Sequence, residues 1–83
     1  MKRALVFKPA AQRELSRMDR NDAQRIVLAM DVFAQTGRGD IKALKGQLHG
    51  RYRLRVGKWR VFFAFIEPAS IVVSEIDNRG QAY

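Results

Sequence analysis

Cysteine is absent from this sequence of 83 residues, which also has only two prolines and one histidine. Without cysteine the chain forms no disulfide and no thiolate metal site, and a reducing compartment suits it. A single histidine among scattered acids offers no metal-ligand spacing, so we expect neither a metal nor a cofactor. The sequence also lacks a glycine-rich phosphate loop and a serine or threonine with a plausible base beside it.

Long hydrophobic runs are absent as well. The longest apolar run extends from Val61 to Ile66, which is far too short to span a membrane. Only four apolar residues stand between the basic N-terminal residues and Lys8, too few for a signal peptide. We therefore expect a cytoplasmic protein with no membrane contact. This length predicts a single domain over residues 1–83, with one small core.

Acidic residues are scarce relative to basic ones. The chain has 16 Lys and Arg against 8 Asp and Glu, a formal net charge of +8. The excess is concentrated in residues 38–60, where eight basic residues accompany one acidic residue, Asp40. Such a concentration indicates an anionic partner, either nucleic acid or an acidic protein segment. The alternative is a solvated basic surface that keeps the protein soluble, although solubility does not require clustering.

The most informative stretch covers residues 51–63. Basic and apolar residues alternate over 51–56, which is the period of a half-buried strand, and a second alternating run follows Gly57. Glycine at the first position of a two-residue type II′ turn would make the two runs a hairpin. In that register Arg55 lies directly opposite Arg60 and shares its face with Arg53. Like charges opposed across a ladder destabilise it by up to about 1 kcal/mol, so this face is expected to bind a polyanion.

The remaining elements follow from local signals. We expect a strand over residues 4–7, a helix from Pro9 to Met18 and a second helix after a capping box at Asn21. Residues 41–48 are ambiguous, being either one helical turn or the lead into a strand. A last strand is expected over 71–76.

The order β-α-α-β-β-β predicts an α+β fold. We expect a small antiparallel sheet with the two N-terminal helices packed on one face, the face that carries Leu54, Val61 and Phe63. The other face, with the arginines, is expected to stay open. The second helix should bury an amphipathic stripe. Its members are Ile26, Met30, Phe33 and Ala34.

The chain resembles the RelE/ParE superfamily of bacterial toxin–antitoxin modules. The resemblance lies in Phe7–Leu15, Leu44–Gly46, Gly50–Val61 and Glu75–Tyr83. It implies an acidic antitoxin, encoded nearby, that covers the basic face, and contact with operator DNA only through the toxin–antitoxin complex. It favours the RelE branch, whose members cleave mRNA in the ribosomal A site without metal, by attack of a ribose 2′-hydroxyl on the adjacent phosphate.

The resemblance also implies roles for single residues. Arg53 and Arg55 take the places of two functional basic residues, while Arg60 and Arg79 match two arginines that hold phosphate. Tyr83 matches a terminal tyrosine that stacks on a base or moves a proton. Further RNA contacts are expected from four residues near these. They are Lys45, Arg51, Lys58 and Phe62.

Two departures from the RelE pattern matter. Members with lysines have them where this chain has Arg53 and Arg55, and guanidinium does not exchange protons at neutral pH. The histidine beside the last arginine is here Asn78. Charge stabilisation survives these changes, but general acid–base catalysis is weakened, and a base would have to be Tyr83, His49 or a ribosomal group. Two alternatives therefore stay open: a ParE-type inhibitor of DNA gyrase, and a degenerate module that only binds antitoxin.

Overall fold

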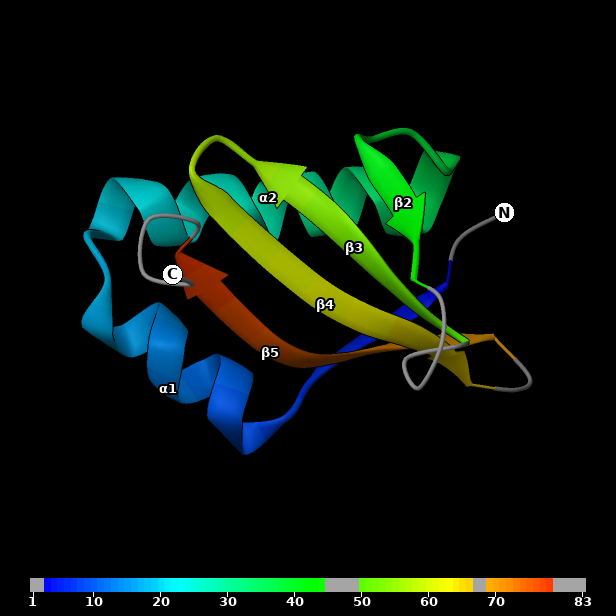
Figure 1. Ribbon diagram of the computed structural model, residues 1–83, viewed down its shortest axis with the longest axis horizontal. Coiled ribbons are helices and arrows are strands. Elements are labelled where there is room, and N and C mark those ends of the chain that lie inside the picture. The colour runs from blue at the N-terminus through cyan, green and yellow to red at the C-terminus, as the bar shows by residue number, and fades with distance from the viewer. Residues whose placement is uncertain (1–2, 45–49, 67–68, 79–83) are drawn as a thin grey trace.

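Two helices pack on one face of a five-stranded sheet (Figure 1). The computed structural model describes residues 3–44, 50–66 and 69–78. The strand order across the sheet is β1-β5-β4-β3-β2. No described helix is long and apolar enough to cross a membrane. The elements are, in chain order, β1 (Ala4–Phe7), α1 (Pro9–Arg17), α2 (Arg20–Thr36), β2 (Ile41–Ala43), β3 (Arg51–Val56), β4 (Trp59–Ile66) and β5 (Ser70–Asn78).

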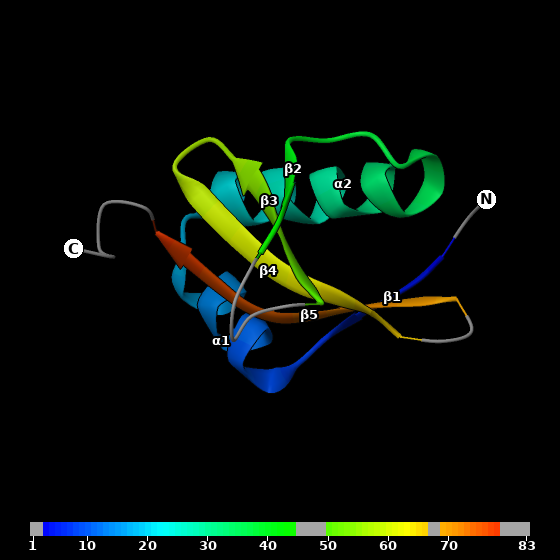
Figure 2. The same cartoon turned by 45° about the vertical axis from the view of Figure 1, so that its right-hand side comes forward.

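The α+β class and the helical layer are confirmed, but the expectation of an antiparallel sheet is wrong at one edge. Strands β2 to β5 are antiparallel neighbours, whereas β1 pairs with β5 in parallel, with Leu5 opposite Ile71. Parallel neighbours need a long connection, and the helices and the other strands supply it. Figure 2 shows β1 and β5 running side by side. A pairing between the two ends of the chain leaves no local signal in the sequence.

The predicted hairpin is confirmed in its register. Val56 pairs with Trp59, and Arg55 lies opposite Arg60. Gly57 has φ +59°, while Lys58 has no positive φ, as a type II′ turn requires. The turn therefore fixes which side chains of β3 and β4 face the same way.

The helix boundaries were partly predicted. Helix α1 begins at Pro9, as expected, but the cap of α2 is Asp19 and not Asn21. The Asp19 carboxylate accepts a hydrogen bond from the Asn21 backbone N–H at 3.1 Å. Asn21 is therefore the second residue of the helix, and Asp19 is its cap. The helix ends at Gly37, whose φ of +77° is left-handed.

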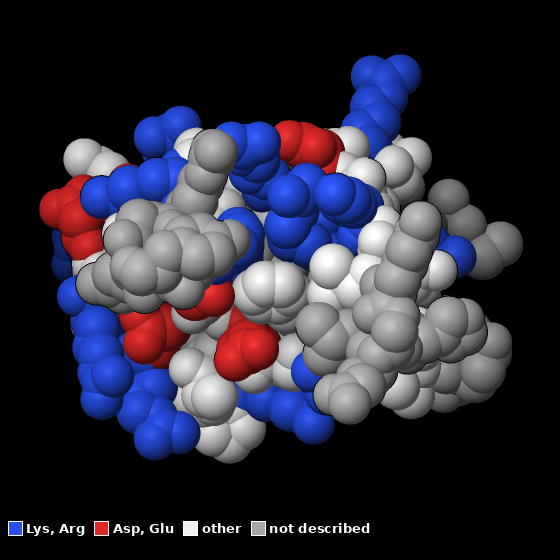
Figure 3. All heavy atoms as spheres, in the orientation of Figure 1, with Lys and Arg blue, Asp and Glu red and all other residues white. Residues whose placement is uncertain are grey.

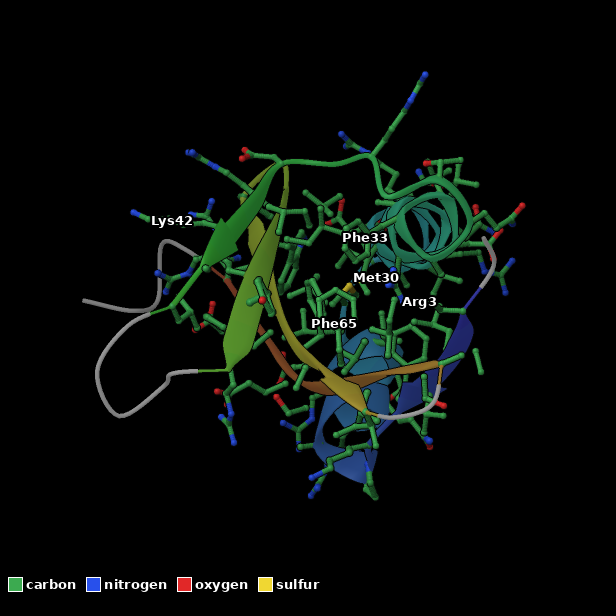
Figure 4. All side chains as sticks on the ribbon, turned by 90° about the vertical axis from the view of Figure 1, so that its right-hand side faces the viewer. Arg3, Met30, Phe33, Lys42 and Phe65 are labelled. Carbon is green, nitrogen blue, oxygen red and sulfur yellow. The ribbon has the colours of Figure 1, made fainter. Side chains whose placement is uncertain are left out.

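The core lies between α2 and the sheet. All four residues of the predicted stripe are buried, and they pack against Leu54, Val61 and Phe63 of the strands. Figure 4 shows Met30, Phe33 and Phe65 pointing into this layer. The ring of Phe33 lies 5.2 Å from that of Phe63 and 6.1 Å from that of Phe65, which are ordinary aromatic packing distances.

A β-bulge adjusts the phase of β5. The register shifts between Phe62 and Phe63 of β4, and the Ser74 hydroxyl donates a 3.3 Å hydrogen bond to the Phe62 carbonyl. The extra residue lets both Val73 and Ile76 reach the core although they are three positions apart. As a result the acidic residues of β5 lie on the face that the helices leave uncovered, called the open face below.

Candidate nucleic-acid interface

Four basic side chains gather on the open face of β2 and β3. Arg51, Arg53 and Arg55 alternate with the buried side of β3, and Lys42 of β2 lies opposite Arg53. Figure 4 shows Lys42 pointing away from α2. We call this group, Lys42, Arg51, Arg53 and Arg55, the basic strip. Figure 3 shows blue spheres gathered over β2 and β3, with one red patch at their upper edge and other acidic residues lower in the view, nearer β5.

The register places like charges opposite each other at two neighbouring positions of the sheet. Lys42 faces Arg53 across β2 and β3, and Arg55 faces Arg60 across β3 and β4. Like charges directly opposite each other destabilise a sheet by a few tenths of a kcal/mol to about 1 kcal/mol when no acid compensates them. One member of each pair has an acidic partner, Asp40 for Arg53 and Asp77 for Arg60. An anion lying across both pairs would relieve the repulsion that remains.

Arg60 departs from the expectation of an openly exposed guanidinium. Its Nε lies 3.0 Å from Oδ1 of Asp77 and its Nη2 lies 3.3 Å from Oδ2, a two-pronged ion pair. The Arg60 side chain is only 19% exposed. The pairing follows from the register of β5, which sets Asp77 directly opposite Arg60. The sequence predicts the last strand over residues 71–76, one residue short of Asp77 and with no register against β4, so it does not give this partner.

Arg53 is also less open than predicted. A nitrogen of its guanidinium lies 3.7 Å from the carboxylate of Asp40, an ion pair too long for a hydrogen bond. The side chain is 20% exposed, and its Nε is buried with no hydrogen-bond partner among the described residues. Phe62 lies opposite Arg53 in the register, as predicted, and the arginine stem is covered accordingly.

Arg55 fits the expectation best. Its side chain is exposed and forms no ion pair with any residue that the structure describes. Its backbone N–H donates a 3.0 Å hydrogen bond to the Asp40 carbonyl, which ties the loop before β2 to β3. Lys42 and Arg51 are exposed as well. Arg55 is therefore the best placed of the predicted residues to meet a phosphate.

The other predicted contacts separate from one another. Phe62 lies on the open face, half-buried, with the Arg60 guanidinium 5.9 Å from its ring centroid. Lys58 lies away from the basic strip, at the hairpin turn, with its Nζ 5.7 Å from the ring of Trp59. It lines a hollow beside Arg25 at the start of α2. Lys58 is therefore not brought together with the strip.

Several sequence-based assignments lie outside the described residues. They concern Lys45, His49, Arg79 and Tyr83. Within the described ranges, no three His, Asp or Glu side chains come together in a way that would hold a metal ion. The chemistry carried by the described part of the open face is anion binding by guanidinium and ammonium groups.

The sequence reading missed three residues of this site. Residues 41–48 carry no clear signal for a helix or a strand, so the sequence does not single out Lys42, although Asp40, Ile41 and Lys42 do alternate like a short strand. Asp40 and Asp77 were overlooked because each meets its arginine across a pairing that only the sheet defines. With the register of the sheet known, the opposite charges of Asp40 and Arg53, and of Asp77 and Arg60, would have indicated these contacts.

Comparison with known proteins bears on what this face does. The family model described as ParE toxin of type II toxin-antitoxin system, parDE, matches residues 5–83, nearly the whole chain. The chain belongs to this family. It is thus a toxin of a type II toxin–antitoxin system, and the resemblance to the RelE/ParE superfamily is confirmed. No curated protein sequence matches it.

Solved structures share the fold of this ParE-family toxin. The RelBE2 toxin–antitoxin complex from Mycobacterium tuberculosis is 20% identical with a TM-score of 0.83, covering 95% of this chain and all (100%) of that one. The RelE–RelB complex from Pyrococcus horikoshii is 19% identical with a TM-score of 0.79, covering 99% and 100%. The YoeB/ParE toxin from Agrobacterium tumefaciens is 19% identical with a TM-score of 0.76, covering 94% and 98%. At these identities the likeness concerns the fold.

Proposed function

We propose that this toxin binds RNA on the open face of its sheet and cleaves mRNA in the ribosomal A site. The observation that carries the proposal is the pair of opposed cations, Lys42 with Arg53 and Arg55 with Arg60. A phosphate backbone crossing β2 to β4 would meet both pairs, and its negative charge would offset their repulsion. Phe62, between Arg53 and Glu75 in the sheet, offers an aromatic surface on which a base could stack.

The proposed chemistry is attack of a ribose 2′-hydroxyl on the adjacent phosphate, which forms a 2′,3′-cyclic phosphate and breaks the bond from phosphorus to the 5′-oxygen of the next nucleotide. The 2′-hydroxyl gives up its proton and the departing 5′-oxygen takes one up. Arg53 and Arg55 would stabilise the charge that develops on the phosphorane oxygens. Arg60, fixed by Asp77, would supply a guanidinium of constant position. Arg79 is proposed to hold phosphate and Tyr83 to stack or to move a proton. Since guanidinium does not transfer protons at neutral pH, the turnover is expected to be slow or to depend on a ribosomal group.

The proposed partners follow from the same assignment. An acidic antitoxin would cover the basic strip and inhibit the toxin, and operator DNA would be reached only through that complex. The site of action would be the cytoplasm, where ribosomes are.

Inhibition of DNA gyrase is the second candidate. It is favoured by the family model, which is that of ParE toxins, and by the engagement of Arg53 and Arg60 with carboxylates of the toxin itself. Under this reading the open face would contact protein and would cut nothing.

Induced expression in bacteria separates the two candidates. Primer extension on abundant messages should reveal new cuts within codons, and Arg55→Ala should reduce them by at least tenfold, the loss expected when one charge-stabilising donor is removed. Arg13→Ala, which removes an exposed helical arginine on α1, is the matched control and should leave the cuts unchanged. Intact messages together with broken DNA would replace the ribonuclease proposal with the gyrase one.

A further inference from the structure

A row of four side chains crosses the open face from β2 to β5. Lys42 lies opposite Arg53. Phe62 lies between Arg53 on one side and Glu75 on the other. Residues directly opposite each other in antiparallel strands share a face of the sheet, with Cβ atoms about 5 Å apart. The row therefore presents two cations, an aromatic ring and a carboxylate at successive strand spacings of about 4.8 Å.

The β-bulge between β4 and β5 determines which side chain ends this row. Phe63 pairs with Val73 on one side of the bulge, and on the other side Phe62 pairs with Glu75. Without the extra residue, Phe62 would face Ser74, and Glu75 would fall on the buried side of the sheet. Bulges commonly re-aim a side chain beside a functional site. This bulge brings a carboxylate next to an aromatic ring on the face proposed to bind RNA.

Glu75 has no partner within the described part of the chain. Its side chain is exposed, and it forms no hydrogen bond or ion pair with any residue that the structure describes. Asp77, the other acid of β5 on this face, is held by Arg60. A carboxylate beside a phosphate-binding strip repels RNA unless it accepts hydrogen bonds from that RNA. Such donors are found on the edges of the bases.

The four bases differ in the hydrogen-bond donors on their Watson–Crick edges. Guanine presents two adjacent donors, N1–H and the N2 amino group, whereas adenine and cytosine each present one donor beside an acceptor nitrogen. Uracil presents one donor between two carbonyl oxygens. An ionised carboxylate has acceptors only, so guanine alone offers a donor to each of its oxygens. Single-stranded RNA displays these edges when its bases splay out and stack on aromatic side chains.

We infer that Glu75 makes this toxin prefer guanine in the RNA that it binds. The guanine ring would stack on Phe62, and its Watson–Crick edge would meet the Glu75 carboxylate. The adjoining phosphates would lie over Arg53 and Lys42, at the other end of the row. The inference rests on the proposed function, because it requires RNA on the open face. Glu75 is then a specificity residue with no part in breaking the bond.

The test measures the binding of labelled heptanucleotides by fluorescence anisotropy. Each is a uridine tract with guanine, adenine, cytosine or inosine at its centre, made of 2′-O-methyl RNA so that it is not cleaved. The guanine oligonucleotide should bind at least about fivefold more tightly than the adenine and cytosine ones, as expected for one bidentate contact. Inosine keeps N1–H but lacks the N2 amino group, so its affinity should lie between. Equal affinities for all four would contradict the inference.

Glu75→Gln distinguishes base recognition from a general effect of charge. Glutamine has the same size but offers one acceptor and one donor, so the preference for guanine should fall to within about twofold. Glu14→Gln is the matched control, because it removes the same charge from a pair with Arg17 on α1 and should leave the preference unchanged. If Glu75→Gln strengthens the binding of all four oligonucleotides by the same factor, the carboxylate only repels RNA and the inference is wrong. Thermal melting checks that both variants are folded.

Mapping of the cuts in mRNA lets this inference and the proposed function fail separately. In the parent toxin, guanine should recur at one fixed position relative to the cut, and Glu75→Gln should spread the cuts over other bases. Cuts that depend on Arg55 but keep the same sequences in Glu75→Gln would remove the inference and leave the nuclease. A guanine preference in binding by a toxin that cuts no message would do the reverse. A toxin that neither binds RNA nor cuts it would overturn both.

Discussion

Asp77 gives Arg60 a structural role in the sheet. Its two-pronged contact holds the Arg60 guanidinium in a partly buried position, and the Arg60 side chain is 19% exposed. An arginine read from the sequence as an open phosphate ligand is thereby a structural residue as well. Removing Asp77 takes both prongs of this contact away from a guanidinium that is only 19% exposed, which is more harmful than removing an exposed ion pair.

Asp77→Ala should therefore lower the free energy of unfolding by about 1–2 kcal/mol, discounted because Asp77 is itself 41% exposed. Urea denaturation followed by tryptophan fluorescence measures this change through Trp59. Glu75→Ala is the matched control, since Glu75 is an exposed acid on the same strand and the same face, and it should change stability by less than about 0.5 kcal/mol. Equal effects would mean that the ion pair contributes nothing specific.

At the scale of elements, the loop between α2 and β2 positions the edge of the sheet. Gly39 has φ +154°, and a Cβ built there would lie 2.8 Å from Cδ1 of Leu54, a core methyl group. Gly37 in the same loop has φ +77° but nothing within 4 Å of its Cβ position. Both positions are strained for a residue with a side chain, but only Gly39 is also crowded.

Gly37→Ala should lower the free energy of unfolding by about 1 kcal/mol, the usual penalty of a left-handed residue with a side chain. Gly39→Ala should cost about 1–3 kcal/mol more than that, because Leu54 is buried and must move. Chemical denaturation of the two variants under identical conditions measures the difference. If the two variants lose the same free energy of unfolding, the close approach of the loop to Leu54 does not contribute to the cost of the Gly39 substitution.

The elements that sequence reading found are those whose signals are local. The β3–β4 hairpin follows from alternation on both sides of Gly57, and α2 follows from its buried stripe and its terminal glycine. Strand β2 is only three residues long, and the parallel pairing of β1 with β5 joins the two ends of the chain. Both depend on the assembled sheet, so no short window of sequence encodes them.

The same distinction applies to the candidate site. The opposition of Arg55 and Arg60 was predictable because one turn sets it. The carboxylates of Asp40 and Asp77 were not, since each reaches its arginine across a different strand or loop. Likewise, Lys42 joins the basic strip only through the pairing of β2 with β3. Local patterns in the sequence predict the arginines of the open face. Their acidic partners, and Lys42, are defined only by strand pairing and by the loop before β2.

At the scale of the whole molecule, the uneven charge predicts a salt-dependent affinity for RNA. If the four cations of the basic strip each neutralise one phosphate of a single strand, the logarithm of affinity should fall with the logarithm of salt with a slope of about −3. Between 50 and 200 mM salt this corresponds to a loss of roughly 50-fold. Fluorescence anisotropy with a labelled single-stranded RNA measures the slope.

Arg51→Ala should make that slope shallower by about 0.7, one phosphate contact, whereas Arg13→Ala on α1 should not alter it. A slope near zero for the parent protein would show that phosphate neutralisation by the strip does not drive binding. Unchanged slopes in both variants, with a steep parent slope, would place the contact elsewhere on this basic molecule.

The opposed cations on β2, β3 and β4 have an evolutionary consequence. Replacing Lys42 by an acid would turn a repulsion across the ladder into an attraction and make the sheet more stable, while removing charge from the surface that meets phosphate. Selection for thermal robustness and selection for toxicity therefore pull this position in opposite directions. In a lineage whose toxin has lost its target, we expect position 42 to drift toward acidic residues, which would give a more stable protein without toxicity.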